Sequence, residues 1–197
     1  TKGKLGRAGE PFRMPTRAKQ ASNGDIFVSD GYGQNRVHRF TSKGEHVLSW
    51  GKGDPVFYES AFGGSKKPVT GKAGTGPGEF NLPHDVTVGP DRRVYVLDRS
   101  NNRCQVFSME GKYVTEWKDV RGGNDASIDS DRVMHIVSAA GVELRRLDGT
   151  LEGRWGEKSA KPGDFLYSPH GVWMDGEGGL YVAEVGGNNR LQKFARV

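Results

Sequence analysis

Three short stretches of this 197-residue chain read alike: Gly24-Asp25-Ile26-Phe27-Val28-Ser29-Asp30, Arg93-Val94-Tyr95-Val96-Leu97-Asp98 and Gly179-Leu180-Tyr181-Val182-Ala183-Glu184. Each leads into a turn rich in Gly and Asn that closes with Asn-Arg, at 35–36, 102–103 and 189–190. A second alternating stretch that ends in Phe follows each turn. Strict alternation of apolar and polar residues predicts half-buried β-strands. We therefore expect a chain built from repeats of short strands.

The repeat unit is about 43 residues long, because Arg103 and Arg190 lie two such units apart with a degenerate unit between them. Units of roughly 40–45 residues that hold four strands are typical of β-propeller blades. The sequence predicts an all-β propeller in a single domain, 1–197, with four blades, which either belong to a larger propeller or are closed by another chain. The blades fall at about 12–51, 78–118, 119–156 and 165–197, and 52–77 is an inserted loop.

The composition agrees with a globular β-protein and excludes several other classes. Gly is unusually frequent, at 30 residues, which suits many tight turns, and the 34% hydrophobic share is too high for a disordered chain. Cys104 is the only cysteine, so an intramolecular disulfide framework is excluded. No apolar stretch is long enough to predict a membrane span. The net charge of +5 produces only a weak electrostatic field, so it does not indicate a class of binding partner.

Two of the five histidines occur in the same local frame. His84 ends the stretch Phe80-Asn-Leu-Pro-His, and His170 ends the similar stretch Phe165-Leu-Tyr-Ser-Pro-His. Both precede an expected inner strand and lie two blades apart, so we expect both at the same depth of the central channel. In a six-bladed ring three such positions converge and could hold a metal with one position open. The alternative is that Pro-His only shapes the turn before an inner strand.

Asn-Arg-Val and Pro-His-Gly-Val at intervals of about 43 residues resemble the NHL-repeat propellers. The stretches 28–36, 49–51, 77–84 and 97–103 are similar, more specifically, to peptidyl-α-hydroxyglycine α-amidating lyase. This resemblance spans about residues 5–197. It implies a six-bladed propeller that cleaves a peptidyl-α-hydroxyglycine into a peptide amide and glyoxylate. It also implies a zinc ion held by three histidines, with a tyrosine and arginines around the substrate.

Carried over by motif, the resemblance implies that His84 and His170 are zinc ligands, that Tyr32 is the catalytic tyrosine and that Arg99 binds substrate. Zinc can polarise a hydroxyl, a tyrosinate can accept its proton, and a guanidinium can hold a carboxylate by two hydrogen bonds. The alternative is that Tyr32 is an ordinary contact residue and that Arg99 only supports its turn. A structural calcium is also implied, although Gly171 stands where the family has an aspartate that helps to hold it.

The third zinc-binding histidine and a second arginine of the family fall upstream of Thr1, so we expect no lyase activity from these residues alone. The alternative function is an NHL-type binding module for a protein or nucleic acid. Acidic residues are interleaved with the basic ones, which disfavours nucleic acid and leaves a small molecule or peptide as the expected partner. Self-association through unpaired propeller edges is the other expected interaction. Family resemblance implies an extracellular or periplasmic protein.

Overall fold

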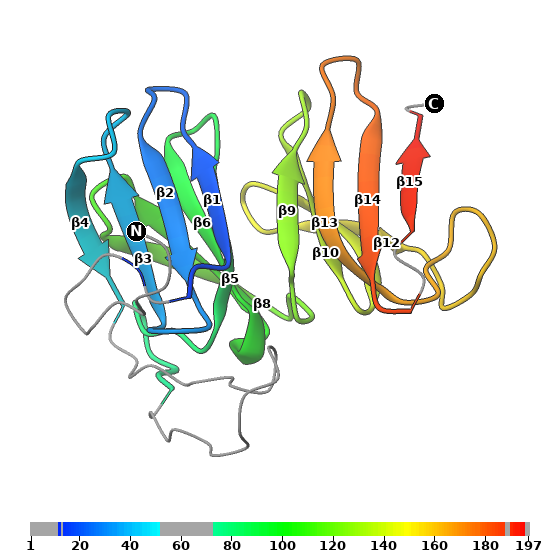
Figure 1. Cartoon of the computed structure of the whole chain (residues 1–197), viewed down its shortest axis with the longest axis horizontal. Helices are drawn as coiled ribbons and strands as arrows, with labels where there is room; N and C mark the ends of the chain where they lie inside the picture. Colours follow the sequence, from blue (N-terminus) through cyan, green and yellow to red (C-terminus); the bar gives the residue numbers. More distant parts are fainter. Residues whose placement is uncertain (1–11, 13, 52–72, 188–189, 196–197) are drawn as a thin grey trace.

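The computed structural model describes residues 12, 14–51, 73–187 and 190–195 (Figure 1). Most of the predicted insertion, 52–77, lies outside the described residues, as does the segment before the first predicted blade. In the part that is described, no helix is long and apolar enough to cross a membrane. The described residues form four antiparallel sheets, one for each predicted blade.

Each sheet is a meander in which consecutive strands pair with one another. Three of the described sheets have four strands and the last has three, and a 3-10 turn, η2 (Arg99–Asn101), follows β6. The strands are β1 (Arg17–Gln20), β2 (Ile26–Asp30), β3 (Arg36–Phe40), β4 (His46–Trp50), β5 (Pro83–Val88), β6 (Arg93–Asp98), β7 (Arg103–Ser108), β8 (Tyr113–Lys118), β9 (Asp125–Ile128), β10 (Val133–Ser138), β11 (Gly141–Arg146), β12 (Leu151–Trp155), β13 (Ser168–Met174), β14 (Leu180–Val185) and β15 (Leu191–Phe194).

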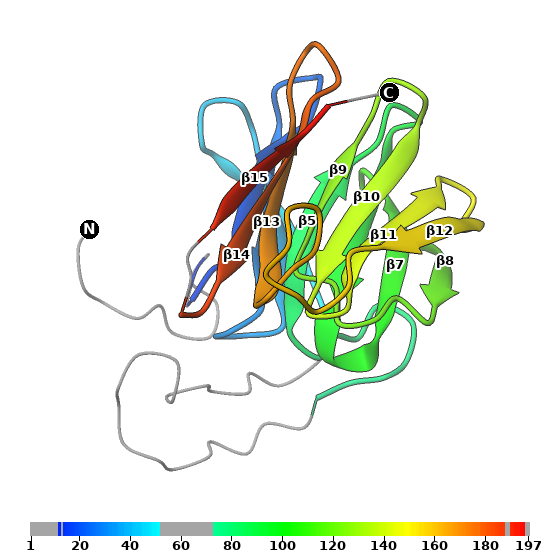
Figure 2. The ribbon, with the colours of Figure 1, turned by 90° about the vertical axis from the view of Figure 1, so that its right-hand side faces the viewer.

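The hydrophobic core is divided into clusters that lie between neighbouring sheets. Strand β6 shows why: Val94 and Val96 pack with residues of the first sheet, whereas Tyr95 and Leu97 pack with residues of the third. Side chains of a β-strand alternate between its two faces, so a central blade strand can contact both neighbouring blades. A third cluster joins the third and fourth sheets. The stacked sheets of Figure 2 are therefore held together mainly by face-to-face burial.

Aromatic residues near the strand ends pack between blades. The ring of Trp50 lies 5.7 Å from that of Phe107 in the next blade, and Trp155 lies 4.7 Å from Phe194. Phe40 is different, because its ring contacts His46 and Phe12 instead, at 5.4 and 5.2 Å. The all-β propeller with four blades is confirmed, and a total of six blades remains a prediction.

The first strand of each sheet, namely β1, β5, β9 or β13, lies on the inner side of its blade (Figure 1). Strand β5 packs against β1 and β9, and β9 packs against β13. The residues just before or at the start of these strands hold equivalent positions: Thr16, His84, Asn124 and His170. Both histidines therefore reach the centre of the fold from inner strands, which is where the candidate site is formed.

Candidate active site

Both Pro-His pairs lie at β-bulges. On β5 the register shifts between Pro83 and Asp85, and on β13 it shifts between Pro169 and Gly171, so neither histidine has a Cα partner on the neighbouring strand. A bulge bends its strand and redirects a side chain. The two imidazoles meet edge to face, with ring centroids 4.8 Å apart and an interplanar angle of 81°. The structure thus brings together two histidines that are two blades apart.

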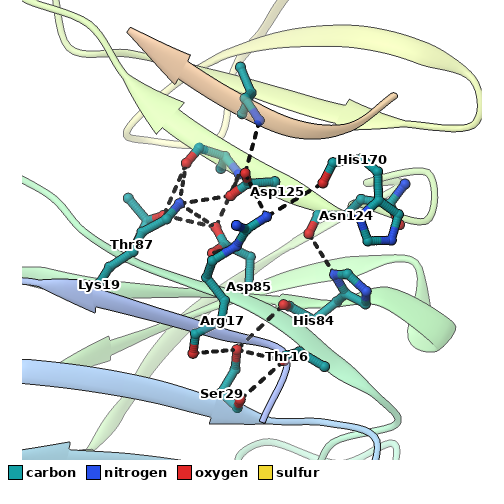
Figure 3. A network of polar contacts seen from close by, with 12 residues as sticks. Thr16, Arg17, Lys19, Ser29, His84, Asp85, Thr87, Asn124, Asp125 and His170 are labelled. Atoms are coloured by element: carbon teal, nitrogen blue, oxygen red, sulfur yellow. Dashed lines mark hydrogen bonds and ion pairs between the residues drawn. The ribbon is translucent and has the colours of Figure 1, made fainter. Parts of the chain in front are cut away.

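The hydrogen bonds of His84 determine its tautomer. Its Nδ1 lies 2.6 Å from the backbone oxygen of Asn124, which can only accept, so Nδ1 carries the proton (Figure 3). In the neutral ring, Nε2 is then an acceptor, and the hydroxyl of Tyr32 donates to it over 3.0 Å. A backbone carbonyl on one nitrogen is the usual support for a histidine that binds a metal through the other. His84 is held in a form that suits metal ligation.

A close backbone contact places Tyr32 beside His84. Gly31 packs so tightly against the Pro83 turn that an added Cβ would lie 2.3 Å from the Pro83 oxygen. The Tyr32 ring is half-buried and stands at 87° to the His84 ring, with centroids 5.5 Å apart. Leu82 has a left-handed backbone, φ 63°, and its N–H donates to Asn35 Oδ1 over 2.7 Å. The turn before His84 is therefore fixed by the Gly- and Asn-containing turn after β2.

Arg99 lies at the start of η2, directly after β6, and its backbone N–H donates to the Leu82 oxygen over 3.2 Å. Asp98 fixes this turn through Oδ1, which accepts from Asn81 N–H over 2.7 Å, and burial raises the pKa of the Asp98 carboxyl. The Arg99 guanidinium is half-buried and forms no hydrogen bond or ion pair with any residue that the structure describes. Its positive charge is therefore available to a ligand.

The environment keeps both imidazoles neutral. Burial lowers the pKa of His84 to about 4, and the charges of His170 and Arg99 act in the same direction, against the Asn124 hydrogen bond and Asp85. Burial also lowers the pKa of His170, with further contributions from Arg99 and Arg17. A metal binds the neutral form of histidine, so both side chains are ready for a metal without prior loss of a proton at neutral pH.

We expect His84 to titrate near pH 4 in the metal-free protein. Its folded pKa lies below the ordinary value of 6.5, so the unfolded chain binds more protons between these two pH values. The stabilising contribution of neutral His84 is complete above pH 6.5 and is lost as the pH falls towards 4; the loss is about 3 kcal/mol, at about 1.36 kcal/mol per pKa unit. Histidine ¹⁵N shifts recorded against pH would report both values, and His84→Gln would assign the signal. A midpoint at or above 6.5, or an Nε2–H tautomer, would contradict the geometry.

Sequence reasoning named Tyr32, His84, Arg99 and His170. The structure places Tyr32 and His170 in contact with His84, and the charge of Arg99 lowers the pKa of both histidines without a direct contact to them. Sequence reasoning did not single out Arg17, whose Nη2 reaches the His170 backbone oxygen at 3.5 Å and is ion-paired to Asp125 at 2.8 Å. The sequence did contain a signal for Arg17. Arg17 and Lys19 lie two positions apart on β1, so both side chains lie on the same face of that strand.

A series of hydrogen bonds connects the equivalent inner positions from blade to blade. Thr16 Oγ1 donates to the Pro83 oxygen over 2.9 Å, His84 Nδ1 donates to the Asn124 oxygen over 2.6 Å, and Asn124 Nδ2 donates to the Pro169 oxygen over 2.8 Å. In each case the side chain of one blade holds the corresponding turn of the next. The candidate site is therefore built into the contacts that align the blades.

The fold and the repeated inner turns define a class of protein, the NHL-repeat propellers. The sequence profile described as "NHL repeat" matches residues 80–107 and 166–194, which include β5 to β7 and β13 to β15 in large part. NHL repeat-containing protein 3 of Homo sapiens is 30% identical over 209 residues, which cover 98% of this chain and 54% of that protein. This chain is an NHL-repeat β-propeller, and it spans about half the length of that relative.

The chain is also similar to amidating enzymes. Peptidyl-alpha-hydroxyglycine alpha-amidating lyase 1 of Drosophila melanogaster is 31% identical over 146 residues, covering 72% of this chain and 24% of that protein. Mouse peptidyl-glycine alpha-amidating monooxygenase is 33% identical over 130 residues, covering 61% of this chain and 12% of the enzyme. The chain therefore resembles the amidating lyases, as the motif at Pro83-His84 indicated.

Among solved structures, Kuenenia stuttgartiensis hydrazine synthase superposes with a TM-score of 0.62 at 13% identity, covering 92% of this chain and 46% of that one. Catalytically inactive virginiamycin B lyase from Staphylococcus aureus, solved with quinupristin, gives 0.59 at 14% identity, with 92% and 55% covered. At these identities the likeness concerns the fold alone.

Proposed function

We propose that this propeller is an amidating-lyase-like enzyme that acts on a peptidyl-α-hydroxyglycine or a related small polar substrate. The observation that carries the proposal is the cluster around His84, in which the neutral ring of His84 lies against His170 and accepts a hydrogen bond from Tyr32. Arg99, which pairs with no residue in the described ranges, contributes positive charge to the same cluster. The similarity to amidating lyases supports the assignment of these residues.

A zinc ion fits part of this arrangement. His84 and His170 would hold it, because both are neutral and His84 Nδ1–H is secured by a carbonyl. In the described ranges no group of three or more His, Cys, Asp or Glu side chains could hold a metal, so these two imidazoles would provide only part of a complete set. When bound, zinc would supply Lewis-acid polarisation of the substrate hydroxyl.

The remaining residues have separate tasks in the proposed reaction. Tyr32, in its deprotonated form, accepts the proton of the substrate hydroxyl. The hydrogen bond that Tyr32 now donates to His84 Nε2 would be given up when that nitrogen binds the metal. As the hydroxyl becomes a carbonyl, the carbon–nitrogen bond breaks and the amide nitrogen takes up a proton, which releases glyoxylate and a peptide amide. Arg99 is suited to hold the substrate carboxylate.

Zinc analysis combined with glyoxylate release tests the proposal. The protein is measured as these 197 residues and with any residues that precede Thr1 in its gene. We expect about one zinc per molecule in the complete protein, lost in His84→Ala and in His170→Ala, together with glyoxylate release from a peptidyl-α-hydroxyglycine. His46→Ala, at an exposed histidine on β4, is the matched control and should retain both properties.

Absence of zinc from the complete protein, or zinc that survives both active-site substitutions, would contradict the metal assignment. A complete protein without zinc or glyoxylate release would favour the alternative, an NHL module that binds a partner without catalysis. The match to NHL repeat-containing protein 3 over nearly the whole chain is the observation that favours this second candidate.

A further inference from the structure

The side chain of Lys19 ends in a cage of oxygen atoms next to the histidine cluster (Figure 3). Its Nζ lies 3.0 Å from Asp85 Oδ2, 2.9 Å from Thr87 Oγ1 and 2.9 Å from Asp125 Oδ1, and it also donates to the Ala126 backbone oxygen. The oxygens belong to β5 and β9, while Lys19 belongs to β1. Carboxylate, hydroxyl and carbonyl oxygens gathered in this way are the surroundings that a hard cation such as Ca²⁺ requires.

The charges of this cage are balanced within the chain. Asp85 and Asp125 are 0% and 2% exposed, so each carboxylate needs a partner. Lys19 contacts both, and Arg17 adds a second cation, with Nη2 2.8 Å from Asp125 Oδ2 and Nε 3.9 Å from Asp85 Oδ1. The two buried negative charges thus face two fixed positive charges.

The calcium that the family resemblance implies does not fit here. A Cβ added at Gly171 would lie 4.0 Å from Asp125 Oδ2, so an aspartate at this position would start beside the oxygen that Arg17 binds. This chain has Gly171 at that position, and Arg17 and Lys19 supply positive charge to the two carboxylates. A divalent ion would have to displace an ammonium that already contacts four oxygens.

We infer that Lys19 is a built-in cation that takes the place of a metal ion, and that it links three inner strands beside the histidine cluster. Its removal uncovers an oxygen cage that accepts Ca²⁺. Lys19, Thr87, Ala126 and Trp173 line a hollow of about 320 Å³ beside the cage. Water can therefore complete the coordination of an ion placed there, because Ca²⁺ takes roughly six to eight ligands.

The test compares thermal unfolding in EDTA and in about 10 mM CaCl₂, a concentration above the ~10⁻⁴–10⁻³ M dissociation constants of weak calcium modules. The wild-type Tm should be the same in both buffers. Lys19→Ala should melt lower in EDTA and recover by several degrees in calcium. Lys19→Met is the matched control, because it also removes the charge but keeps the space filled, and calcium should not restore its Tm.

Terbium luminescence gives a second readout, because Trp173 lines the same hollow and can sensitise a bound ion. Lys19→Ala should show a signal that Ca²⁺ displaces and that the double variant Lys19→Ala/Asp125→Asn lacks. Two results would overturn the inference. One is a wild-type Tm that rises with calcium and no longer does so in Asp125→Asn, because the cage would then bind calcium while Lys19 is still present. The other is a Lys19→Ala protein that binds neither calcium nor terbium. This holds whether that protein is folded in both EDTA and CaCl₂ or unfolded in both.

Discussion

Replacement of Tyr32 by phenylalanine is expected to lower kcat for glyoxylate release by about 10²–10⁴-fold, the usual contribution of a positioned acid or base. The change removes one oxygen and retains the ring that stands against His84 at 87°. The hydroxyl is the only part of Tyr32 that contacts His84 Nε2 by a hydrogen bond. We therefore expect a loss in kcat with little change in KM and with the zinc content unchanged.

Steady-state kinetics of the complete, zinc-loaded protein measure this split. Tyr113→Phe is the matched control, because Tyr113 is 38% exposed and lies on the outer strand β8. It should leave kcat and KM at the wild-type values. A Tyr32→Phe protein that keeps the wild-type kcat would exclude Tyr32 as the base, and one that loses zinc would show that its hydroxyl acts mainly by positioning His84.

Truncation of Phe107 to alanine is expected to destabilise the fold by about 3–5 kcal/mol. Phe107 is 1% exposed, and its ring contacts Trp50 of the first blade and Phe80 before the second, each at 5.7 Å. The substitution leaves a cavity between two blades that are joined by side-chain packing, so the neighbouring backbone can relax only in part. For a chain of this length we expect a fall in Tm of roughly 10 °C.

Urea unfolding followed by tryptophan fluorescence would measure the loss, since Trp50 is in direct contact with the mutated ring. Phe107→Leu is the control that keeps most of the volume, and it should cost less than about 1.5 kcal/mol. If Phe107→Ala and Phe107→Leu differ from the wild type by the same small amount, the contact between these two blades is not a principal source of stability.

The fold could be predicted because each repeat can be recognised from residues that are close together in the sequence. The continuous apolar run in 93–98, which is buried on both faces, and the turn that ends in Asn102-Arg103 are local features, and both are visible in one sequence. The equivalence of Pro83-His84 and Pro169-His170 is visible for the same reason. These features depend on residues near one another in the chain.

The parts that could not be predicted depend on contacts between blades. The proton on His84 Nδ1 follows from the position of Asn124, 40 residues later in the chain. The pairing of Lys19 with Asp125 is longer in range still, and nothing in the local sequence around Lys19 identifies its partner. Charge pairing across a channel can be recognised only when the inner strands are placed in space.

The blade-to-blade hydrogen bonds suggest how chemistry could arise in such a ring without loss of assembly. At equivalent positions, Thr16 and Asn124 each use a side chain to hold the next blade. His84 does the same with one nitrogen and leaves the other towards Tyr32. A single substitution to histidine at such a position can therefore add a free ring nitrogen while the hydrogen bond to the next blade is kept.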